Sequence, residues 1–297
     1  MSIPRTAVIG LGSMGYGMAQ SCLRAGLPTW GQDINPDAMA RFQSEGGRPG
    51  PLPADLDAVM VVVLNAAQTE SVLFGEQGIV ARLTPGAVVL SCATVPPAFA
   101  RDMEARCKVQ GIHYLDAPIS GGATKAAQGK LSVMASGTPE AFAAARPVLD
   151  ACAETVFELG AEAGPGSAMK AVNQLLAGVH IATMAEALTF GMTQGVEPAQ
   201  FVEVISKCAG TSWMLENRAP HIVDGDYTPR SQVNIWPKDL GIVLDVAKSA
   251  GFSAPITAAA LQQYMVAVGM GLGGEDDAAI AKVYARNAGL TLPEDKA

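Results

Sequence analysis

Short apolar segments alternate with amphipathic segments along the first half of the chain. The apolar segments have the length of β-strands, and several of the stretches between them place hydrophobic residues at helical spacing. The expected strands are residues 7–10, 29–33, 58–64, 87–91, 113–117, 131–136 and 156–159, and the expected helices are residues 13–25, 36–45, 97–110 and 139–151. This alternation predicts an α/β domain with a mostly parallel sheet built by right-handed crossovers.

The pattern changes after residue 160. The sequence Ala-Gly-Pro-Gly at residues 163–166 interrupts both periodicities, and no later segment resembles a strand. Residues 167–194 form one long helical pattern, which would span about 42 Å at the α-helical rise. Further helices are expected at residues 198–208, 213–218, 238–250, 257–270 and 277–285. We therefore expect an α/β domain at residues 1–164 and an all-α domain at residues 165–297, joined by the long helix.

Composition narrows the class of protein. The 297 residues are 49% hydrophobic and 16% charged, which is typical of a globular chain with a sizeable core. The net charge of −8, without a block of basic residues, argues against nucleic-acid or anionic-membrane partners. No uninterrupted apolar run approaches the ~20 residues of a membrane span, and no secretory signal is visible. Five scattered cysteines and three dispersed histidines predict reduced thiols, no metal site and a cytoplasmic location.

A glycine pattern follows the first expected strand. Gly10-Leu11-Gly12-Ser13-Met14-Gly15 has the spacing of a dinucleotide-binding loop, in which the glycines allow a tight turn, close approach of a pyrophosphate and close helix packing. Asp33 lies eighteen positions after Gly15, at the end of the next strand, where a carboxylate accepts hydrogen bonds from ribose hydroxyls and repels a 2′-phosphate. The alternative is an ordinary glycine turn followed by a surface aspartate. The context favours a Rossmann-type domain that binds NAD rather than NADP.

Four segments of the chain carry a resemblance to a known family: Val-Ile-Gly-Leu-Gly-Ser-Met-Gly at residues 8–15, Asp-Ala-Pro-Ile-Ser-Gly-Gly at 116–122, Gly-Ser-Ala-Met-Lys-Ala-Val-Asn-Gln at 166–174 and Lys-Asp-Leu at 238–240. In these segments the chain resembles the β-hydroxyacid dehydrogenase superfamily, the 3-hydroxyisobutyrate dehydrogenase-like enzymes, and the match covers almost its whole length. This resemblance implies an NAD-dependent oxidoreductase that acts on a small hydroxyacid. The family's habit also implies a homodimer or a homotetramer.

The resemblance assigns roles to residues in each segment. It implies a catalytic acid/base at Lys170, which follows the Gly-Pro-Gly interruption, where the helix N-terminus and apolar neighbours favour the neutral amine that a base requires. The implied substrate-binding residues are Ser120, Gly121, Gly122, Asn173 and Gln174. The implied cofactor-binding residues are Gly10, Leu11, Gly12, Ser13, Met14, Gly15, Asp33, Leu64, Asn65, Thr94 and Lys238, the last from the second domain.

The residues taken alone leave simpler roles open. Lys170 would then be a solvated charge, residues 120–122 a common turn, and Gln174 a partner in a hydrogen bond between domains. Thr94 would then cap the helix expected at residues 97–110. Trp213 and Asn217, four residues apart on one helix face, would line the substrate pocket or pack in the core.

Within the superfamily, the closest likeness is to the L-threonate dehydrogenases. It rests on residues 65–68, 174–180, 212–218 and 221–229, and on Gln174 in the place where many members have Asn. The leading hypothesis is therefore oxidation of a polyhydroxylated C4 acid, foremost L-threonate, to its 2-oxo product. The alternatives are a 3-hydroxyisobutyrate dehydrogenase, a tartronate semialdehyde reductase and, more remotely, a nucleotide-binding sensor without catalysis.

Overall fold

The computed structural model describes residues 3–293. The chain forms two units, Met1–Lys170 and Ala171–Ala297, and the division falls inside the long helix α7 (Pro165–Thr193). The functional boundary expected between residues 164 and 165 stays a prediction. All the strands belong to the first unit. Among the described residues of the second unit, the regular elements are all helices.

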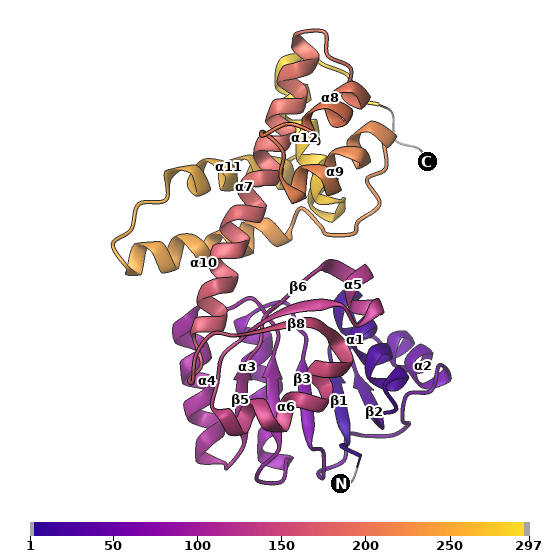
Figure 1. Ribbon diagram of the computed structural model, residues 1–297, viewed down its shortest axis with the longest axis vertical. Helices are drawn as coiled ribbons and strands as arrows, with labels where there is room; N and C mark the ends of the chain where they lie inside the picture. Colours follow the sequence, from indigo (N-terminus) through magenta and orange to yellow (C-terminus); the bar gives the residue numbers. More distant parts are fainter. Residues whose placement is uncertain (1–2, 294–297) are drawn as a thin grey trace. The chain divides into compact units, whose positions relative to one another are not determined.

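Five parallel strands form the main sheet of the first unit (Figure 1). They are β1 (Thr6–Ile9), β2 (Thr29–Gln32), β3 (Ala58–Val61), β4 (Val88–Ser91) and β5 (His113–Asp116), in the spatial order β2-β1-β3-β4-β5. A second sheet contains β6 (Ile119–Ser120), β7 (Leu131–Ala135) and β8 (Ala153–Glu158). In it β6 and β7 run antiparallel, whereas β7 and β8 run parallel. The mostly parallel α/β fold predicted from the sequence is therefore confirmed.

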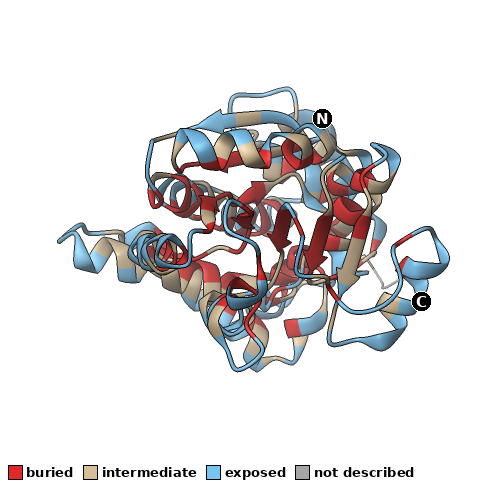
Figure 2. Cartoon of the chain, turned by 90° about the horizontal axis from the view of Figure 1, so that it is seen from below, coloured by how far each residue is buried: buried red, intermediate tan, exposed pale blue. Residues whose placement is uncertain are grey.

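Helices cover both faces of the main sheet. Val8 and Met60 belong to a core cluster that includes residues of α1 (Ser13–Arg24) and α6 (Pro139–Cys152). Ile9 and Val61 belong to the opposite cluster, with residues of α3 (Ala66–Phe74) and α4 (Pro97–Val109). Figure 2 shows the strands as buried between helices with exposed outer faces. Because neighbouring strand residues point to opposite faces, a sheet covered on both sides needs the continuous apolar runs that the sequence displays.

Several elements of this unit differ from the expectation, among them β8, which begins at Ala153 instead of residue 156. The strand expected at residues 58–64 ends at Val61, and α3 begins shortly after it. The reason is local: the Asn65 side chain accepts a hydrogen bond from the Gln68 backbone N–H and caps the new helix. Where a turn was considered at residues 120–122, β6 ends at Ser120 and the short helix α5 (Gly122–Gln128) begins two residues later. The helix expected at residues 36–45 is present as α2 (Pro36–Ser44).

A buried carboxylate holds the beginning of α7. Asp116 is the last residue of β5 and has no exposed surface. Its Oδ2 accepts hydrogen bonds from the backbone N–H groups of Gly164 at 3.0 Å and Ser167 at 2.8 Å. Its Oδ1 accepts one from the Ser167 hydroxyl at 2.6 Å, and the Ser136 hydroxyl lies 3.3 Å from Oδ2. Burial raises the pKa of Asp116, and the hydrogen bonds from Ser167, Gly164 and Ser136 oppose that increase.

Helices α7 to α12 build the second unit. After α7 come α8 (Pro198–Ile205), α9 (Trp213–Asp224), α10 (Ile235–Ser249), α11 (Pro255–Gly269) and α12 (Ala281–Ala288). By length and composition alone α7 would suffice to cross a membrane, which no single apolar run in the sequence had indicated. Its side chains Ile181, Met184 and Leu188 are fully or almost fully buried in the core cluster of this unit, as in the core helix of a globular domain.

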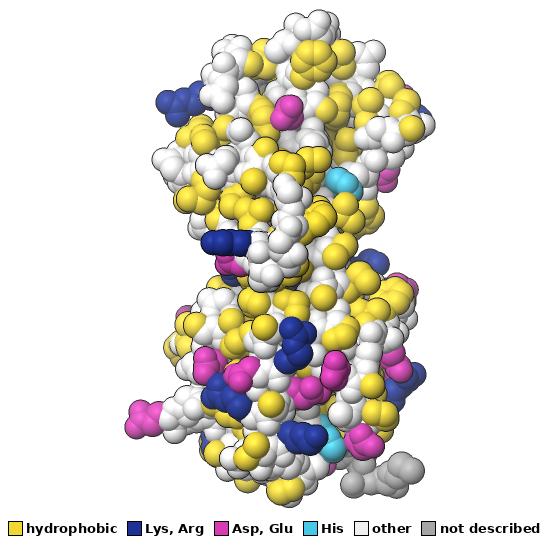
Figure 3. Space-filling model, turned by 90° about the vertical axis from the view of Figure 1, so that its left-hand side faces the viewer, with side chains coloured by type: hydrophobic (Ala, Val, Ile, Leu, Met, Phe, Trp, Pro, Cys, Tyr) yellow, Lys and Arg dark blue, Asp and Glu magenta, His cyan; other side chains and the backbone are white. Residues whose placement is uncertain are grey.

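The second unit also exposes large apolar side chains. On the face shown in Figure 3, hydrophobic side chains are interspersed among polar ones on this unit. The exposed members include Val172, Leu176 and Phe190 on α7, Val204 on α8, Trp213 on α9, and Ile256, Met265 and Val266 on α11. Single exposed apolar residues are ordinary, whereas exposed apolar residues gathered into one patch mark a surface that another protein covers.

We predict that replacing Asp116 destabilises the protein. Asp116→Ala leaves two backbone N–H groups without an acceptor and should lower the free energy of unfolding by on the order of 2 kcal/mol or more. Asp116→Asn is the matched control, because it keeps one oxygen for those two N–H groups and should lose clearly less. Thermal melts followed by circular dichroism measure both variants. An Ala variant that melts with the parent would contradict this role for Asp116.

Candidate active site

The predicted cofactor-binding residues of the first unit follow the carboxyl ends of parallel strands. The glycine loop begins after β1, Asp33 follows β2, Leu64 and Asn65 come after β3, and Thr94 comes after β4. Because these strands are all parallel, their carboxyl ends meet at one edge of the sheet. The fold therefore brings these residues to the edge at which open α/β sheets bind their ligands.

The three glycines of the loop differ in what a side chain would meet at each position. Gly10 has φ of +98°, and a Cβ there would collide with the Val62 carbonyl oxygen. A Cβ on Gly15 would overlap the Gly10 carbonyl oxygen, so α1 approaches β1 as closely as it does only because Gly15 lacks a side chain. A Cβ on Gly12, by contrast, would meet nothing within 4 Å. Gly12 thus keeps open space beside the first turn of α1, where a pyrophosphate would approach the backbone N–H groups.

The remaining loop residues hold this conformation in place. Leu11 is buried, and Met14 packs, partly buried, against the core cluster that contains α1. Ser13 is the first residue of α1. The Leu11 backbone N–H donates to Asp33 Oδ2 at 2.5 Å, and the Asn35 N–H donates to Asp33 Oδ1 at 2.8 Å. Asp33 therefore fixes the glycine loop with the same carboxylate that is predicted to bind a ribose.

Three other predicted cofactor residues lie on connections after the strands. The Leu64 backbone N–H donates to Gln68 Oε1 at 2.9 Å, and the Leu64 side chain is 64% exposed. The Asn65 side chain caps α3. Thr94 is half-buried and does not cap α4, whose N-cap is Pro96 without a side-chain bond. The simpler role considered for Thr94 is therefore wrong, while its contact with a cofactor stays a prediction.

Lys170 lies beside the predicted carboxylate-binding segment. It is in the second turn of α7, its surface is only 8% exposed, and its ammonium group donates to the Ile119 carbonyl oxygen at 2.8 Å. Ile119 directly precedes Ser120 in β6. The solvated position considered for Lys170 is therefore wrong. The contact brings the predicted base and the predicted carboxylate-binding segment together, although they are fifty residues apart in the sequence.

The segment Ser120-Gly121-Gly122 requires its glycines. Gly121 has φ of +133° and Gly122 has φ of +72°, both in the region that favours glycine. A Cβ on Gly121 would lie 2.9 Å from the Lys125 Cβ, whereas a Cβ on Gly122 would meet nothing within 4 Å. The backbone at Gly122 is therefore open on the side where a side chain would stand, so a small ligand can approach it closely.

The remaining predicted residues form one group within the second unit, joined by two hydrogen bonds and an ion pair. Gln174 Nε2 donates to Asp239 Oδ2 at 2.5 Å, and Asn173 Nδ2 donates to Gln174 Oε1 at 2.9 Å. The Lys238 ammonium group lies 2.6 Å from Asp239 Oδ1. The sequence predicted that Lys238 begins its helix. This prediction is wrong, because α10 begins three residues earlier at Ile235.

Two aspartates in these arrangements were not predicted as functional residues. Asp116 caps the helix of Lys170, and Asp239 binds both Gln174 and Lys238. Both stand in segments that the resemblance covered, and for Asp116 a charged residue at the end of an apolar strand was the available signal. Trp213, which was considered for the core, is 60% exposed and does not pack there.

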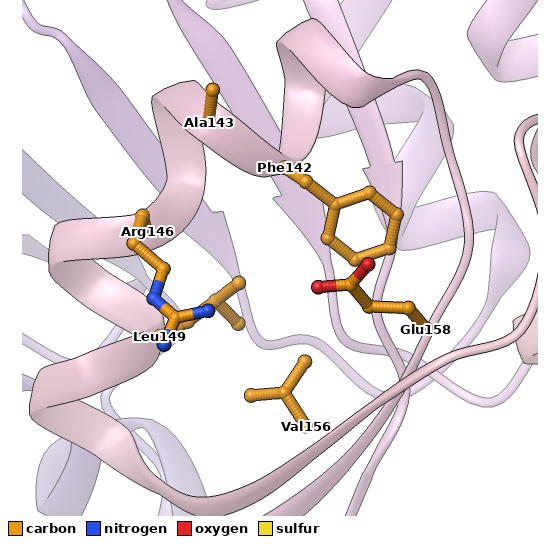
Figure 4. Close-up of a pocket in the computed structure, with 6 residues that line it drawn as sticks. All are labelled: Phe142, Ala143, Arg146, Leu149, Val156 and Glu158. Carbon is orange, nitrogen blue, oxygen red and sulfur yellow. The ribbon is translucent and has the colours of Figure 1, made fainter.

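Two pockets of the first unit lie away from the predicted site residues. One, of about 200 Å³, is lined by residues of α6 and β8, among them Phe142, Arg146 and Glu158 (Figure 4). Another, of about 470 Å³, is lined by residues such as Asp57 and Thr84 that precede β3 and β4, at the opposite edge of the sheet. Neither contains a predicted site residue. Within residues 3–293 no group of three His, Cys, Asp or Glu side chains could hold a metal ion.

Comparison with known proteins assigns both parts of the chain to described families. Residues 5–160 match the NAD binding domain of 6-phosphogluconate dehydrogenase. Residues 164–284 match the domain described as NAD-binding of NADP-dependent 3-hydroxyisobutyrate dehydrogenase.

Relatives match over nearly the whole chain. An L-threonate dehydrogenase of Cupriavidus necator is 50% identical and covers 96% of this chain and 97% of its own length. An L-threonate dehydrogenase of Escherichia coli K12 is 45% identical, with 97% of this chain and 96% of its own covered. A crystal structure titled 3-hydroxyisobutyrate dehydrogenase, from Salmonella typhimurium, has a TM-score of 0.88 and 45% identity, and covers 94% of this chain and 99% of its own.

These matches confirm the resemblance stated from the sequence, and the geometry of the glycine loop fits the NAD-binding domain they indicate. The chain belongs to the NAD-dependent hydroxyacid dehydrogenase family, in its 3-hydroxyisobutyrate dehydrogenase-like branch.

Proposed function

We propose that this protein oxidises L-threonate to its 2-oxo product with NAD, and that Lys170 is the acid/base. The observation that carries the proposal is the contact between the Lys170 ammonium group and Ile119, next to Ser120. A base for the hydroxyl and a binding segment for the carboxylate are needed close together, because a 2-hydroxy acid has its two groups on adjacent carbons. The likeness to L-threonate dehydrogenases supports the choice of substrate.

The proposed reaction needs three contributions from this chain. The Ser120 hydroxyl and the open backbone at Gly122 bind the carboxylate. Lys170 acts in its neutral amine form, oriented by Ile119 and by the Asp116-capped start of α7, and accepts the proton of the hydroxyl on the reacting carbon. NAD, when bound, takes the hydride from that carbon. The C–H and O–H bonds break, a C=O bond forms, and the proton remains on the Lys170 amine.

Polar side chains one helical turn further along α7 favour a hydroxyl-rich acid. Asn173 and Gln174 are three and four residues after Lys170, and their amides hydrogen-bond hydroxyl groups well and methyl groups poorly. This distinguishes L-threonate from 3-hydroxyisobutyrate, whose branch is a methyl group. It also separates an enzyme from a nucleotide sensor, which would need neither the amides nor a buried lysine.

We further propose that the cofactor is NAD rather than NADP. The Asp33 carboxylate stands at the end of β2, where it accepts from the glycine loop and has further lone pairs for ribose hydroxyls. A 2′-phosphate at that position would place its negative charge against the carboxylate.

Self-association and a cytoplasmic location complete the proposal. The exposed apolar side chains of the second unit support a homodimer or homotetramer that covers them. The five cysteines are free thiols, with Cys22 and Cys152 only 3.6 Å apart between sulfur atoms and not bonded, which suits a reducing compartment.

Removing the proposed base should abolish most turnover. Lys170→Ala is expected to lower kcat for L-threonate by about 100-fold or more, because a general acid/base contributes 10² to 10⁴ in rate. Lys170→Arg should fail almost as severely, since a guanidinium does not lose its proton near neutral pH. NADH absorbance at saturating substrate measures both.

The control for this prediction is Lys130→Ala, which removes an exposed lysine of the first unit and should retain the parent's kcat. Retention of most turnover in Lys170→Arg would show that another group is the base. An unmodified enzyme that oxidises none of L-threonate, D-threonate, erythronate, 3-hydroxyisobutyrate and glycerate would overturn the proposed function itself.

Cofactor preference should depend on Asp33. Asp33→Ser is expected to narrow the ratio of kcat/KM for NAD over NADP, because it removes both the ribose acceptor and the repulsion of a 2′-phosphate. Asp37→Ser removes the same charge from an exposed position four residues later and should leave the ratio near the parent's. Equal use of both cofactors by the unmodified enzyme is the result that this proposal does not allow.

Light scattering coupled to size exclusion should report a dimer or tetramer. A charged residue in place of an exposed apolar one on α11, such as Met265→Glu, should shift the mass toward the monomer because it places a charge in the covered surface. A parent protein with the mass of one chain at all concentrations would refute self-association.

A further inference from the structure

A buried carboxylate in the second unit is bound by an amide on one side and an ammonium group on the other. Asp239, on α10, has only 2% of its surface exposed. Its Oδ2 accepts from Gln174 Nε2 at 2.5 Å, and its Oδ1 lies 2.6 Å from Lys238 Nζ. One oxygen of Asp239 thus accepts a hydrogen bond from Gln174, and the other forms an ion pair with Lys238.

The close approach of α7 and α10 explains why Asp239 reaches Gln174. The two helices meet at Gly178, where a Cβ would lie 2.8 Å from both Leu240 and the Trp236 ring. The hydroxyl of Tyr264, whose ring stacks on Trp236, donates to the Gly178 carbonyl oxygen at 2.9 Å and fastens this crossing. Gln174 is one turn before Gly178 on α7, and Asp239 directly precedes Leu240 on α10, so the crossing brings their side chains together.

The carboxylate determines how both amides of α7 are turned. A carboxylate only accepts hydrogen bonds, so Gln174 must direct its NH₂ group to Asp239 and its Oε1 away from it. That Oε1 accepts from the NH₂ group of Asn173 at 2.9 Å. Asn173 is therefore left with Oδ1, an acceptor, for anything outside this group. No hydrogen bond to Asn173 Oδ1 occurs within the described part of the chain, and Asn173 remains partly exposed.

We propose that Asp239 is a positioning residue that makes Asn173 an acceptor for a hydrogen-bond donor on the carbon next to the one oxidised. This inference rests on the proposed function, which places Asn173 at the substrate. This role of Asn173 extends the expected substrate class to acids with a different hydrogen-bond donor on that carbon. A hydroxyl on that carbon donates to Oδ1, and so does an ammonium group, which is a donor only. The enzyme should therefore oxidise 3-amino-2-hydroxy acids as well as 2,3-dihydroxy acids.

Asp239→Asn should reverse the direction of both hydrogen bonds that the amides of α7 make in this group. Asn has one oxygen, and the Lys238 ammonium group competes for it because it has no other way to bind an amide side chain. The new NH₂ group then faces Gln174, which must turn its oxygen toward it and its own NH₂ group toward Asn173. Asn173 finally presents NH₂ instead of oxygen. A hydroxyl substrate adapts by accepting, whereas an ammonium substrate meets a donor.

The test compares 2,3-dihydroxybutanoate with 3-amino-2-hydroxybutanoate in the parent and the variant. We expect the ratio of kcat/KM for the amino acid over the dihydroxy acid to fall about tenfold or more in Asp239→Asn, the change that corresponds to one hydrogen bond of about 1.4 kcal/mol. Any effect through Lys238 on the cofactor acts on both acids and cancels in the ratio. Asp245→Asn, which removes an exposed carboxylate from the same helix, should leave the ratio unchanged.

Two further measurements distinguish hydrogen-bond direction from charge and from folding. The ratio is also measured in Gln174→Met, which keeps the buried Asp239 charge and breaks the group at its centre, so a fall of the ratio in that variant does not come from a lost charge. The side-chain ¹⁵N–¹H signals of Asn173 and Gln174 in the unliganded protein should both shift in Asp239→Asn. Should that variant fail to fold, Gln174→Met breaks the same group at its centre, and the Asn173 amide signal should then shift.

The outcomes separate this inference from the proposed function. An unchanged ratio in Asp239→Asn, a ratio that falls there but not in Gln174→Met, or unchanged amide signals of Asn173 overturns the role of Asp239. Failure of the parent to oxidise any 2-hydroxy acid overturns the proposed function instead. The comparison is then made with the hydroxyacid that the enzyme does oxidise and its counterpart with an amine on the neighbouring carbon.

Discussion

The first unit depends on where α7 begins, and a single buried carboxylate decides it. Asp116 ends the last strand of the main sheet and accepts hydrogen bonds from the backbone at Gly164 and from both donors of Ser167. The positive end of the helix dipole and these donors compensate a charge that burial disfavours. Because Lys170 follows Ser167 by less than one turn, the cap also sets where its ammonium group reaches Ile119. The sheet thereby determines the position of the proposed base.

A second buried carboxylate holds a polar side chain further along α7. Gln174 is held by Asp239 much as Ser167 is held by Asp116, each by a carboxylate with almost no exposed surface. Removing one partner of such a pair is costly, because the other polar group stays buried without compensation. Buried polar groups therefore restrict a site to one arrangement more strongly than apolar packing does, since packing tolerates small shifts and a hydrogen bond to a fixed carboxylate does not.

Much of the fold followed from the sequence, because its signals are local. The parallel sheet, the long helix and the glycine loop were all predicted correctly, since apolar periodicity and the spacing of Gly10, Gly12 and Gly15 lie within short windows. The end of β3 was placed three residues too late, because Val62, Val63 and Leu64 continue the apolar run although Asn65 already caps the next helix. Periodicity cannot indicate where a chain leaves a sheet when the next residues are also hydrophobic.

The two aspartates escaped prediction because their partners are distant in sequence. Asp116 and Ser167 are separated by 51 positions and Gln174 and Asp239 by 65, and neither spacing has a local pattern. The sequence did indicate that polar groups stood at Lys170, Asn173 and Gln174, but not which atom each would present. That depends on the partner: a carboxylate forces an amide to donate, and the next amide then presents its oxygen. The hydrogen-bonding atoms that a site presents to its ligand are therefore determined by the residues behind those that touch the ligand.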